Sequence, residues 1–300
     1  MEAIRNVYPT RTTHKIPMFE RLDPVVYARP GEAPAGPLGA EDIERFERDG
    51  FLFCEGLLSA DEARRYREEL RRLSQDPSLL DEECVVREPR SNEVRSIFRV
   101  HRISALLAAL GRDRRFVEPV RQILGSDVYI HQSRINYKPG FEGKGFNWHS
   151  DFETWHAEDG MPRMRAVSCS IILTDNNEFN GPLMLIPGSH KYFVPCIGAT
   201  PDDNYKSSLK DQQIDVPDRE SLAGLIERGG IRAPKGSAGS VLFFDCNTLH
   251  GSNANMSPFP RSNAFFVYNS VDNRLQEPYA ARRRRPLFLA DDGCQPIRPG

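Results

Sequence analysis

The chain has 300 residues and a mass of 34.0 kDa, with 39% hydrophobic and 27% charged residues, which is ordinary for a globular protein. A chain of this length forms a core without a disulfide or a structural metal, so any metal it binds is expected to be functional. Its 40 Lys and Arg residues against 42 Asp and Glu give a formal charge of -2, which offers no general attraction to nucleic acid.

Membrane and export segments are not expected either. No stretch approaches the roughly 20 apolar residues of a membrane span, and the N-terminal residues lack the apolar segment of a secretory signal. Cys169 and Cys246 lie in apolar runs and are expected to be small core residues rather than ligands. We therefore expect a cytoplasmic protein with reduced thiols and with no nucleic-acid or membrane partner.

The first third of the chain is expected to be mainly helical after an irregular arm. Residues 1–40 are rich in Pro and Gly and show no sustained periodicity, which is typical of an arm or lid. Ser59 and Glu62 have the spacing of a capping box at the start of a helix. The predicted helices are residues 40–49, ended by Gly50; a helix after Ser59 with an apolar stripe at Ala63, Tyr66, Leu70 and Leu73; and residues 103–124, broken near Gly111 and ended by Gly125.

Beyond Gly125 the apolar period changes from about 3.6 to 2 residues, and short runs rich in Val, Ile, Phe and Tyr alternate with turn residues. Short strands without alternating helices favour an antiparallel sandwich or barrel over a doubly wound sheet. The polar residues 200–230 are expected to form a helical or irregular insertion. Strands are predicted over residues 128–138, 165–174, 183–187, 240–246 and 262–271.

The expected organisation is an arm followed by one domain. Residues 1–40 form the arm, and residues 41–300 form a single domain. The parts of that domain are expected to be a mainly helical region at 41–125, a β core at 126–275 and a C-terminal tail at 276–300.

Residues 146–165 contain both Trp residues, two His and several acids, with little apparent capacity to form a core. Function is the favoured explanation. His149 and Asp151 are spaced by one residue, so in an extended segment they point to the same side. His250, about a hundred residues further on at the end of a strand, completes the two-His, one-carboxylate pattern of non-haem Fe(II) oxygenases, which leaves positions open for a co-substrate and O2.

Arg261 begins a later strand, which we expect to lie beside the strand that leads to His250. A buried Arg needs an anion, and its planar guanidinium can bind the distal carboxylate of 2-oxoglutarate through two hydrogen bonds. Phe265 lies on the same face four residues on, so this face is expected to line a lumen. By contrast, the basic run 282–285 is expected to be a solvated surface feature.

The predicted strand 128–138 has a polar face that consists of Gln132, Arg134, Asn136 and Lys138. Such a row is either the solvated face of an edge strand or a set of inward-facing groups. The metal motif favours the second interpretation, because a cavity for an oxo acid and a polar substrate needs hydrogen-bond donors. Phe146, Trp155 and Phe244 would ordinarily be core residues, but beside a metal they can form an aromatic wall that attracts cations.

The segments WHSDFETWHAEDGMPRMRAVS, LMLIPGSHKYF and LHGSN, together with Arg261, resemble the ectoine hydroxylases of the phytanoyl-CoA-hydroxylase-like Fe(II)/2-oxoglutarate dioxygenases. The resemblance covers most of the chain. It implies a mainly β fold with flanking helices and a double-stranded β-helix (jelly roll, cupin-like) core. It also implies hydroxylation of the compatible solute ectoine to 5-hydroxyectoine under osmotic stress, with 2-oxoglutarate and O2 converted to succinate and CO2, by a homodimer.

The resemblance also implies roles for individual residues. The Fe(II) ligands would be His149, Asp151 and His250. The 2-oxoglutarate residues would be Lys138, Asn136, Arg261 and Ser252. The substrate residues would be Gln132, Arg134, Phe146, Trp155, Ser170, Phe244, Phe265 and Phe98. Ectoine has a carboxylate for Arg134 and a cationic ring for the aromatic residues. Related halogenating enzymes have Ala or Gly at the carboxylate position, so Asp151 indicates hydroxylation.

Three alternatives remain at this stage. The same chemistry could act on another small zwitterionic or amino-acid-like substrate. A non-catalytic jelly-roll protein could bind a solute, although an open triad has no purpose in a binding protein. A closed zinc site that includes His156 would instead give a hydrolase, but a fourth ligand would use one of the open positions.

Overall fold

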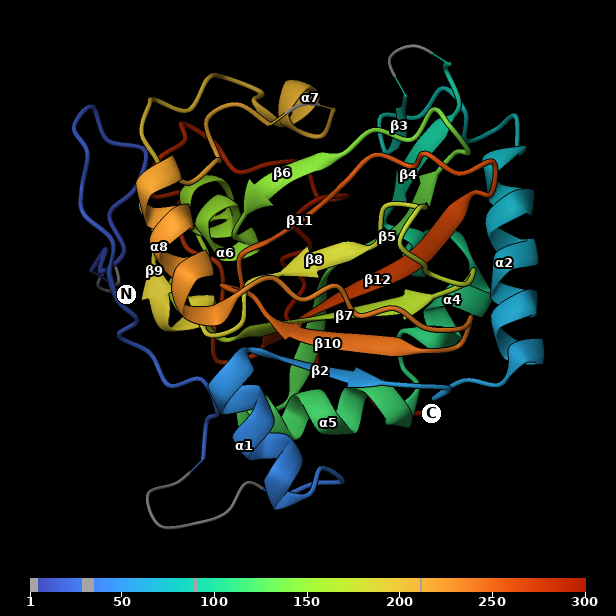
Figure 1. Ribbon diagram of the computed structural model, residues 1–300, viewed down its shortest axis with the longest axis horizontal. Helices are drawn as coiled ribbons and strands as arrows, with labels where there is room; N and C mark the ends of the chain where they lie inside the picture. Colours follow the sequence, from blue (N-terminus) through green and yellow to red (C-terminus); the bar gives the residue numbers. More distant parts are fainter. Residues whose placement is uncertain (1–4, 29–34, 89–90, 211) are drawn as a thin grey trace.

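The computed structural model describes residues 5–28, 35–88, 91–210 and 212–300. Two antiparallel sheets form the centre of the molecule, as the β-sandwich prediction requires (Figure 1). The larger sheet has the order β2 (Phe51–Cys54), β10 (Val241–Asp245), β7 (Ala166–Ile172), β12 (Arg261–Ser270), β5 (Val128–Lys138), β4 (Val94–Phe98), β3 (Val85–Arg87). The smaller sheet has the order β6 (Phe146–His149), β11 (His250–Ser252), β8 (Leu183–Leu185), and β1 (Phe19–Glu20) pairs with β9 (Tyr192–Phe193).

The helices of the first third cover one face of the larger sheet. They are α1 (Ala40–Asp49), α2 (Ala60–Ser74), α3 (Val100–Ile103), α4 (Ala105–Leu110) and α5 (Arg114–Leu124). Phe116 of α5 and Leu107 of α4 are fully buried in the same apolar cluster as Ile171 and Phe266 of the sheet. The opposite face of the sheet is turned toward β6, β11 and β8, and the functional site lies between the two sheets.

The local helix signals predicted the helix ends well. α1 has the predicted bounds and ends at Gly50, whose φ of 83° permits its N–H to bond the Phe46 carbonyl. The capping box of α2 is present: Glu62 N–H donates to Ser59 Oγ at 3.2 Å, and Ser59 N–H donates to the Glu62 carboxylate at 2.8 Å. The predicted helix 103–124 corresponds to α4 and α5, with the expected break after Leu110, and the short α3 precedes it.

The predicted strands are present, and β5 has the predicted bounds. The predicted neighbour of the strand that begins at Arg261 is wrong, however. β12 pairs with β5 and β7, whereas β10, which leads to His250, pairs with β2 and β7. The chain leaves the larger sheet after β10 to form β11 in the smaller sheet, and it returns to the larger sheet on the far side of β7. Residues 200–230 contain α7 (Tyr205–Ser208) and α8 (Arg219–Gly229), as expected for a partly helical insertion.

The expectation that residues 146–165 contribute little to a core is wrong. The segment contains α6 (Asp151–Thr154), followed by the π-helical turn η1 (Trp155–Asp159). Its apolar residues form a second core cluster with aromatic residues of the N-terminal segment and of β9. The buried members of this cluster include Phe152, Trp155, Met161, Met164, Tyr8 and Phe193. The acidic and His side chains of the segment are buried as well. Each has a polar partner that offsets the cost of its burial.

The basic run 282–285 divides into two parts. The side chains of Arg282 and Arg283 are 86% and 71% exposed, as expected for a solvated surface. The expectation is wrong for Arg285, which is buried and bonds both carboxylate oxygens of Asp159 at 2.7 and 2.6 Å. A carboxylate partner of this geometry offsets the cost of removing the guanidinium from water.

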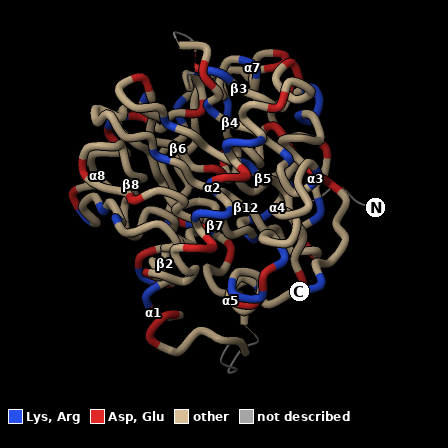
Figure 2. Tube along the Cα trace, turned by 90° about the vertical axis from the view of Figure 1, so that its right-hand side faces the viewer, with Lys and Arg blue, Asp and Glu red and all other residues tan. Residues whose placement is uncertain are grey.

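Charges of both signs are mixed along the described part of the chain (Figure 2). This distribution agrees with the near-zero net charge and leaves no extended field of one sign. Within the described residues, none of the helices combines the length and the apolar character that a membrane crossing requires.

Candidate active site

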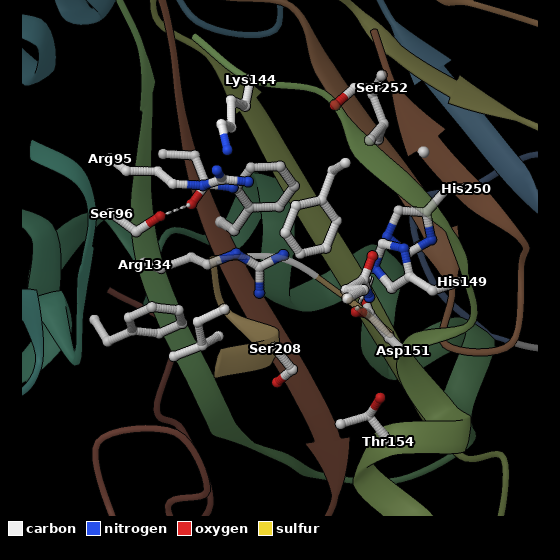
Figure 3. A pocket seen from close by; sticks show the side chains of 18 of the residues that line it. Arg95, Ser96, Arg134, Lys144, His149, Asp151, Thr154, Ser208, His250 and Ser252 are labelled. Atoms are coloured by element: carbon white, nitrogen blue, oxygen red, sulfur yellow. Dashed lines mark hydrogen bonds and ion pairs between the residues drawn. The ribbon is translucent and has the colours of Figure 1, made fainter. Parts of the chain in front are cut away.

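His149, Asp151 and His250 lie together at one end of the smaller sheet (Figure 3). His149 ends β6 and His250 begins β11, and the two residues are direct partners in the pairing of these strands. Asp151 begins α6 two residues later. One ligand atom from each residue lies within 4.8 Å of the others. The Asp151 oxygens are 3.8 Å from His149 Nε2 and 3.9 Å from His250 Nε2, so one ion can contact all three side chains.

Backbone carbonyls fix the orientation of both imidazole rings. Nδ1 of His149 lies 2.8 Å from the Asn147 carbonyl, and Nδ1 of His250 lies 2.9 Å from the Thr248 carbonyl. A carbonyl only accepts, so each Nδ1 is the donor and each Nε2 keeps its lone pair for a metal. This arrangement is the usual support of a metal-binding histidine.

The protonation states suit a divalent cation. Burial, together with the nearby His149, lowers the pKa of His250 to about 4, so its ring is neutral at pH 7. Burial alone would raise the pKa of Asp151, but His250, Arg134 and His149 outweigh that effect and lower it below its usual value. Two imidazoles and one carboxylate fit Fe(II) and leave coordination positions open toward the cavity.

The polar face of β5 lines the cavity beside the triad. Gln132, Arg134, Asn136 and Lys138 all contribute to its wall, which confirms the inward-facing interpretation. β5 is paired on both sides, with β12 and β4, so it is not the edge strand that the alternative required. In Figure 3 the side chain of Arg134 extends toward the triad.

One part of the cavity holds two basic side chains that suit an anion. Arg261 and Lys138 are partners across β12 and β5 and are both buried. Nε and Nη1 of Arg261 have no hydrogen-bond partner, and burial lowers its pKa to about 10. Burial and the charges of Arg261 and Arg95 lower the pKa of Lys138 to about 6, although Lys138 Nζ donates to Ser252 Oγ at 2.9 Å. The two unpartnered nitrogens of Arg261 fit the distal carboxylate of 2-oxoglutarate.

Aromatic side chains surround the guanidinium of Arg134. Its Cζ lies 4.6 Å from the centre of the Phe265 ring, and Nη1 donates to Gln132 Oε1. Phe98, Phe146, Trp155 and Phe265 line the cavity. Two expected substrate residues have other contacts: the Phe244 ring packs 5.0 Å from the His250 ring, and Ser170 Oγ accepts a hydrogen bond from Asn263 at 3.1 Å.

The sequence and structure also place the chain in a known family. A family model of the phytanoyl-CoA dioxygenases matches residues 46–263. The curated ectoine dioxygenase of Halomonas elongata is 58% identical over 287 residues, which cover 95% of this chain and 86% of that relative. The relative from Stutzerimonas stutzeri is 53% identical over 286 residues, which cover 95% and 94%. The chain belongs to the ectoine dioxygenases of this family.

Solved structures of family members agree with this assignment. EctD from S. alaskensis with bound Fe is 47% identical and has a TM-score of 0.86 to this structure, with 98% of each chain covered. The structure of EctD from S. alaskensis with 2-oxoglutarate and 5-hydroxyectoine has a TM-score of 0.87 at the same identity, with 98% of this chain and 97% of that chain covered. The carbocyclase SnoK, at 19% identity and a TM-score of 0.61, shares the fold. The jelly-roll prediction is confirmed.

Several cavity residues of this family member were not identified from the sequence. Arg285 reaches the cavity from the C-terminal tail, and Arg95 and Glu88 reach it from β4 and the residue after β3. The insertion after β9 contributes Ser208, Leu209, Gln212 and Asp215. These residues lie in segments without a motif. The density of Arg at 282–285 was a signal in the tail, but it was interpreted as a solvated surface.

Proposed function

We propose that this protein hydroxylates ectoine to 5-hydroxyectoine and converts 2-oxoglutarate and O2 to succinate and CO2, with His149, Asp151 and His250 as the Fe(II) ligands. The observation that supports this most strongly is the buried, carbonyl-oriented triad beside a cavity with two anion-seeking cations. When bound, Fe(II) together with 2-oxoglutarate supplies the oxidising chemistry that protein side chains lack.

Arg261, together with Lys138, is proposed to bind the distal carboxylate of 2-oxoglutarate. Ser252, which is bonded to Lys138, and Asn136, which accepts a hydrogen bond from Ser96 at 2.9 Å, are proposed to fix the position of the co-substrate. The unpartnered Arg261 nitrogens support this role, because an anion there would remove the cost of two buried donors without partners.

Arg134 and Gln132 are proposed to orient the ectoine carboxylate. Gln132 Nε2 is itself held by the Leu289 carbonyl at 2.8 Å, so its oxygen is directed toward Arg134. Phe98, Phe146, Trp155 and Phe265 would enclose the cationic ring and exclude water. Phe244 and Ser170 are proposed to act indirectly, by holding the residues around the cavity in place.

Assembly, location and domain division are also proposals. We propose that the hydroxylation serves the response to osmotic stress inside the cell, which would place the chain in the cytoplasm. We propose a homodimer by analogy with the family, built from protomers with an arm at residues 1–40 and one catalytic domain at residues 41–300.

The test is mass spectrometry of ectoine incubated with the protein, Fe(II), ascorbate and 2-oxoglutarate under air. A gain of one oxygen is expected, and it should be lost in His149→Ala and Asp151→Ala. His156→Gln is the matched control, because His156 lies in the same segment but its Nδ1 bonds the Met161 carbonyl at 2.8 Å instead of pointing at the triad. Oxidation of another zwitterion in preference to ectoine would overturn the substrate, and retained activity in either triad variant would overturn the ligand set.

A further inference from the structure

The segment that holds Asp151 has one face on the cavity and another against the N-terminal arm. Asp151, Thr154 and Trp155 all line the cavity, and their spacing of three and four residues places them on one side of a helix. Glu153 follows Asp151 by two residues, so its side chain lies on nearly the opposite side. It is 1% exposed, and its carboxylate faces the arm rather than the cavity.

Arg11 of the arm binds that carboxylate with both ends of its guanidinium. Nε of Arg11 donates to Glu153 Oε1 at 2.6 Å, and Nη2 donates to Oε2 at 2.7 Å. Thr10 Oγ1 adds a bond to Oε1 at 2.6 Å. The third nitrogen, Nη1, lies 3.5 Å from Glu158 in η1. One arginine from the N-terminal arm therefore contacts both α6 and η1 on the side that faces away from the cavity.

The backbone at Arg11 is held in an uncommon conformation. Its φ is 56°, in the left-handed region that residues other than glycine seldom adopt. The Arg11 N–H donates to the Cys196 carbonyl at 2.9 Å, and the Cys196 N–H donates to Thr10 Oγ1 at 2.9 Å. Backbone strain of this kind is found at functional sites, where the surrounding contacts maintain it.

Stability alone is a poor reason for such a pair. Both side chains are almost fully buried, and a buried ion pair is often no more stabilising than apolar residues of the same size. What a two-point guanidinium–carboxylate contact adds is a defined orientation of the carboxylate. Here that orientation sets the rotation of the helix that has Asp151 and Trp155 on its other side.

We propose that Arg11 is a positioning residue for the reaction: through Glu153 it fixes the rotation of α6 and η1, and so the direction in which Asp151 and Trp155 enter the cavity. This inference rests on the proposed function in one respect, namely that ectoine lies against Trp155. It assigns the arm a role in the geometry of the active site.

The decisive variant is Arg11→Lys, which keeps the charge but loses the two-point contact. Arg21→Lys is the matched control, since Arg21 lies in the same arm and forms a buried pair with Asp245 of β10 at 2.8 Å, with both side chains 3% exposed. Hydroxyectoine and succinate are measured in the same reaction. Arg11→Lys should form hydroxyectoine about 10- to 100-fold more slowly, the range expected for a misplaced reacting group. It should also form more succinate than hydroxyectoine.

Arg21→Lys should still form succinate and hydroxyectoine in equal amounts, even if its melting temperature falls as much as that of Arg11→Lys. Equal amounts from Arg11→Lys as well would overturn the proposal. If Arg11→Lys folds poorly, the double variant Arg11→Met with Glu153→Gln removes both buried charges together and should again give excess succinate.

Amide hydrogen exchange supplies a readout that needs neither ectoine nor metal. The amides of residues 151–159 should exchange faster in Arg11→Lys than in Arg21→Lys, and equal exchange would overturn the positioning role. If the unmodified protein does not hydroxylate ectoine, the proposed function fails, while the exchange comparison still decides the role of Arg11.

Discussion

Arg261 and Lys138 place two cationic side chains side by side in the buried part of the cavity, on directly paired residues of β12 and β5. Removal from water lowers the pKa of both groups, and the charges of Arg261 and Arg95 lower the pKa of Lys138 further. The protein without co-substrate therefore contains an unfavourable arrangement that an anion relieves.

Replacement of Arg261 by Met should stabilise the co-substrate-free protein while preventing 2-oxoglutarate binding. The change removes a buried charge with two unpartnered nitrogens, and a gain of about 1–3 kcal/mol in the free energy of unfolding is expected. Urea unfolding with and without 2-oxoglutarate measures both effects. Arg232→Met, at an exposed position outside this cavity, should change stability by less than about 0.5 kcal/mol. Tight 2-oxoglutarate binding by Arg261→Met would contradict the assignment.

Binding of 2-oxoglutarate should weaken as the pH rises above about 6. The pKa of Lys138 is about 6 without co-substrate, and a bound carboxylate raises it. Above pH 6 the free protein must therefore take up a proton on binding, so the dissociation constant rises by up to about ten-fold per pH unit until the pKa of the complex is passed.

Calorimetry on Mn(II)-loaded protein in two buffers with different ionisation heats should detect this proton uptake, and Lys138→Met should abolish it. A dissociation constant that stays the same between pH 6 and pH 8 would contradict the role of Lys138.

The sequence predicted those site residues whose direction is determined by a local spacing pattern. The two-residue alternation of β5 placed Gln132 and Arg134 on the inner face, and the one-residue spacing of His149 and Asp151 indicated a shared ligand set. The pairs Arg11–Glu153 and Arg285–Asp159 join residues more than a hundred positions apart. No periodicity relates such residues, so their contacts emerge only from the folded chain.

At the scale of elements, the sequence predicted where helices end but not which strands pair. Gly50 and the Ser59 capping box fixed helix ends because the relevant bonds lie within a few residues. β6 and β11 contain four and three residues, too few for an alternation to be recognised. The order β10, β7, β12 depends on how the chain crosses between the sheets, which periodicity does not encode.

The capping box of α2 permits a prediction at this scale. Ser59→Ala removes the acceptor of the Glu62 N–H and should lower the free energy of unfolding by about 1 kcal/mol. The measurement is urea unfolding followed by circular dichroism. Ser74→Ala at the other end of α2, where the hydroxyl donates to the Arg71 carbonyl, should have an effect below about 0.5 kcal/mol. Equal losses in the two variants would show that the cap does not stabilise this helix.

At the scale of the whole molecule, segments from both ends of the chain converge on one site. The arm contacts the back of α6, and Arg285 reaches the cavity from the tail. The insertion after β9 adds Asn204, which donates to Glu158 at 2.8 Å. The chain thus surrounds the site with local charges, while the net charge of -2 remains small.

This charge distribution predicts that ectoine affinity depends little on salt. A zwitterion has no net charge to be attracted by a distant field, and the formal charge of -2 creates only a weak one. Gln132, Trp155 and Phe265, which are proposed to bind ectoine, are buried around the cavity, and Arg134 is partly buried beside them. Bulk ions screen such groups poorly.

The KM for ectoine should therefore change less than about two-fold between roughly 0.05 and 0.5 M KCl, although the screening length falls from about 14 to about 4 Å over that range. Succinate formation at varied ectoine concentration measures this, and a sucrose series of equal osmolarity separates ionic from osmotic effects. A KM that changes by more than about ten-fold with KCl but not with sucrose would mean that long-range charge, rather than the paired groups around Arg134, selects the substrate.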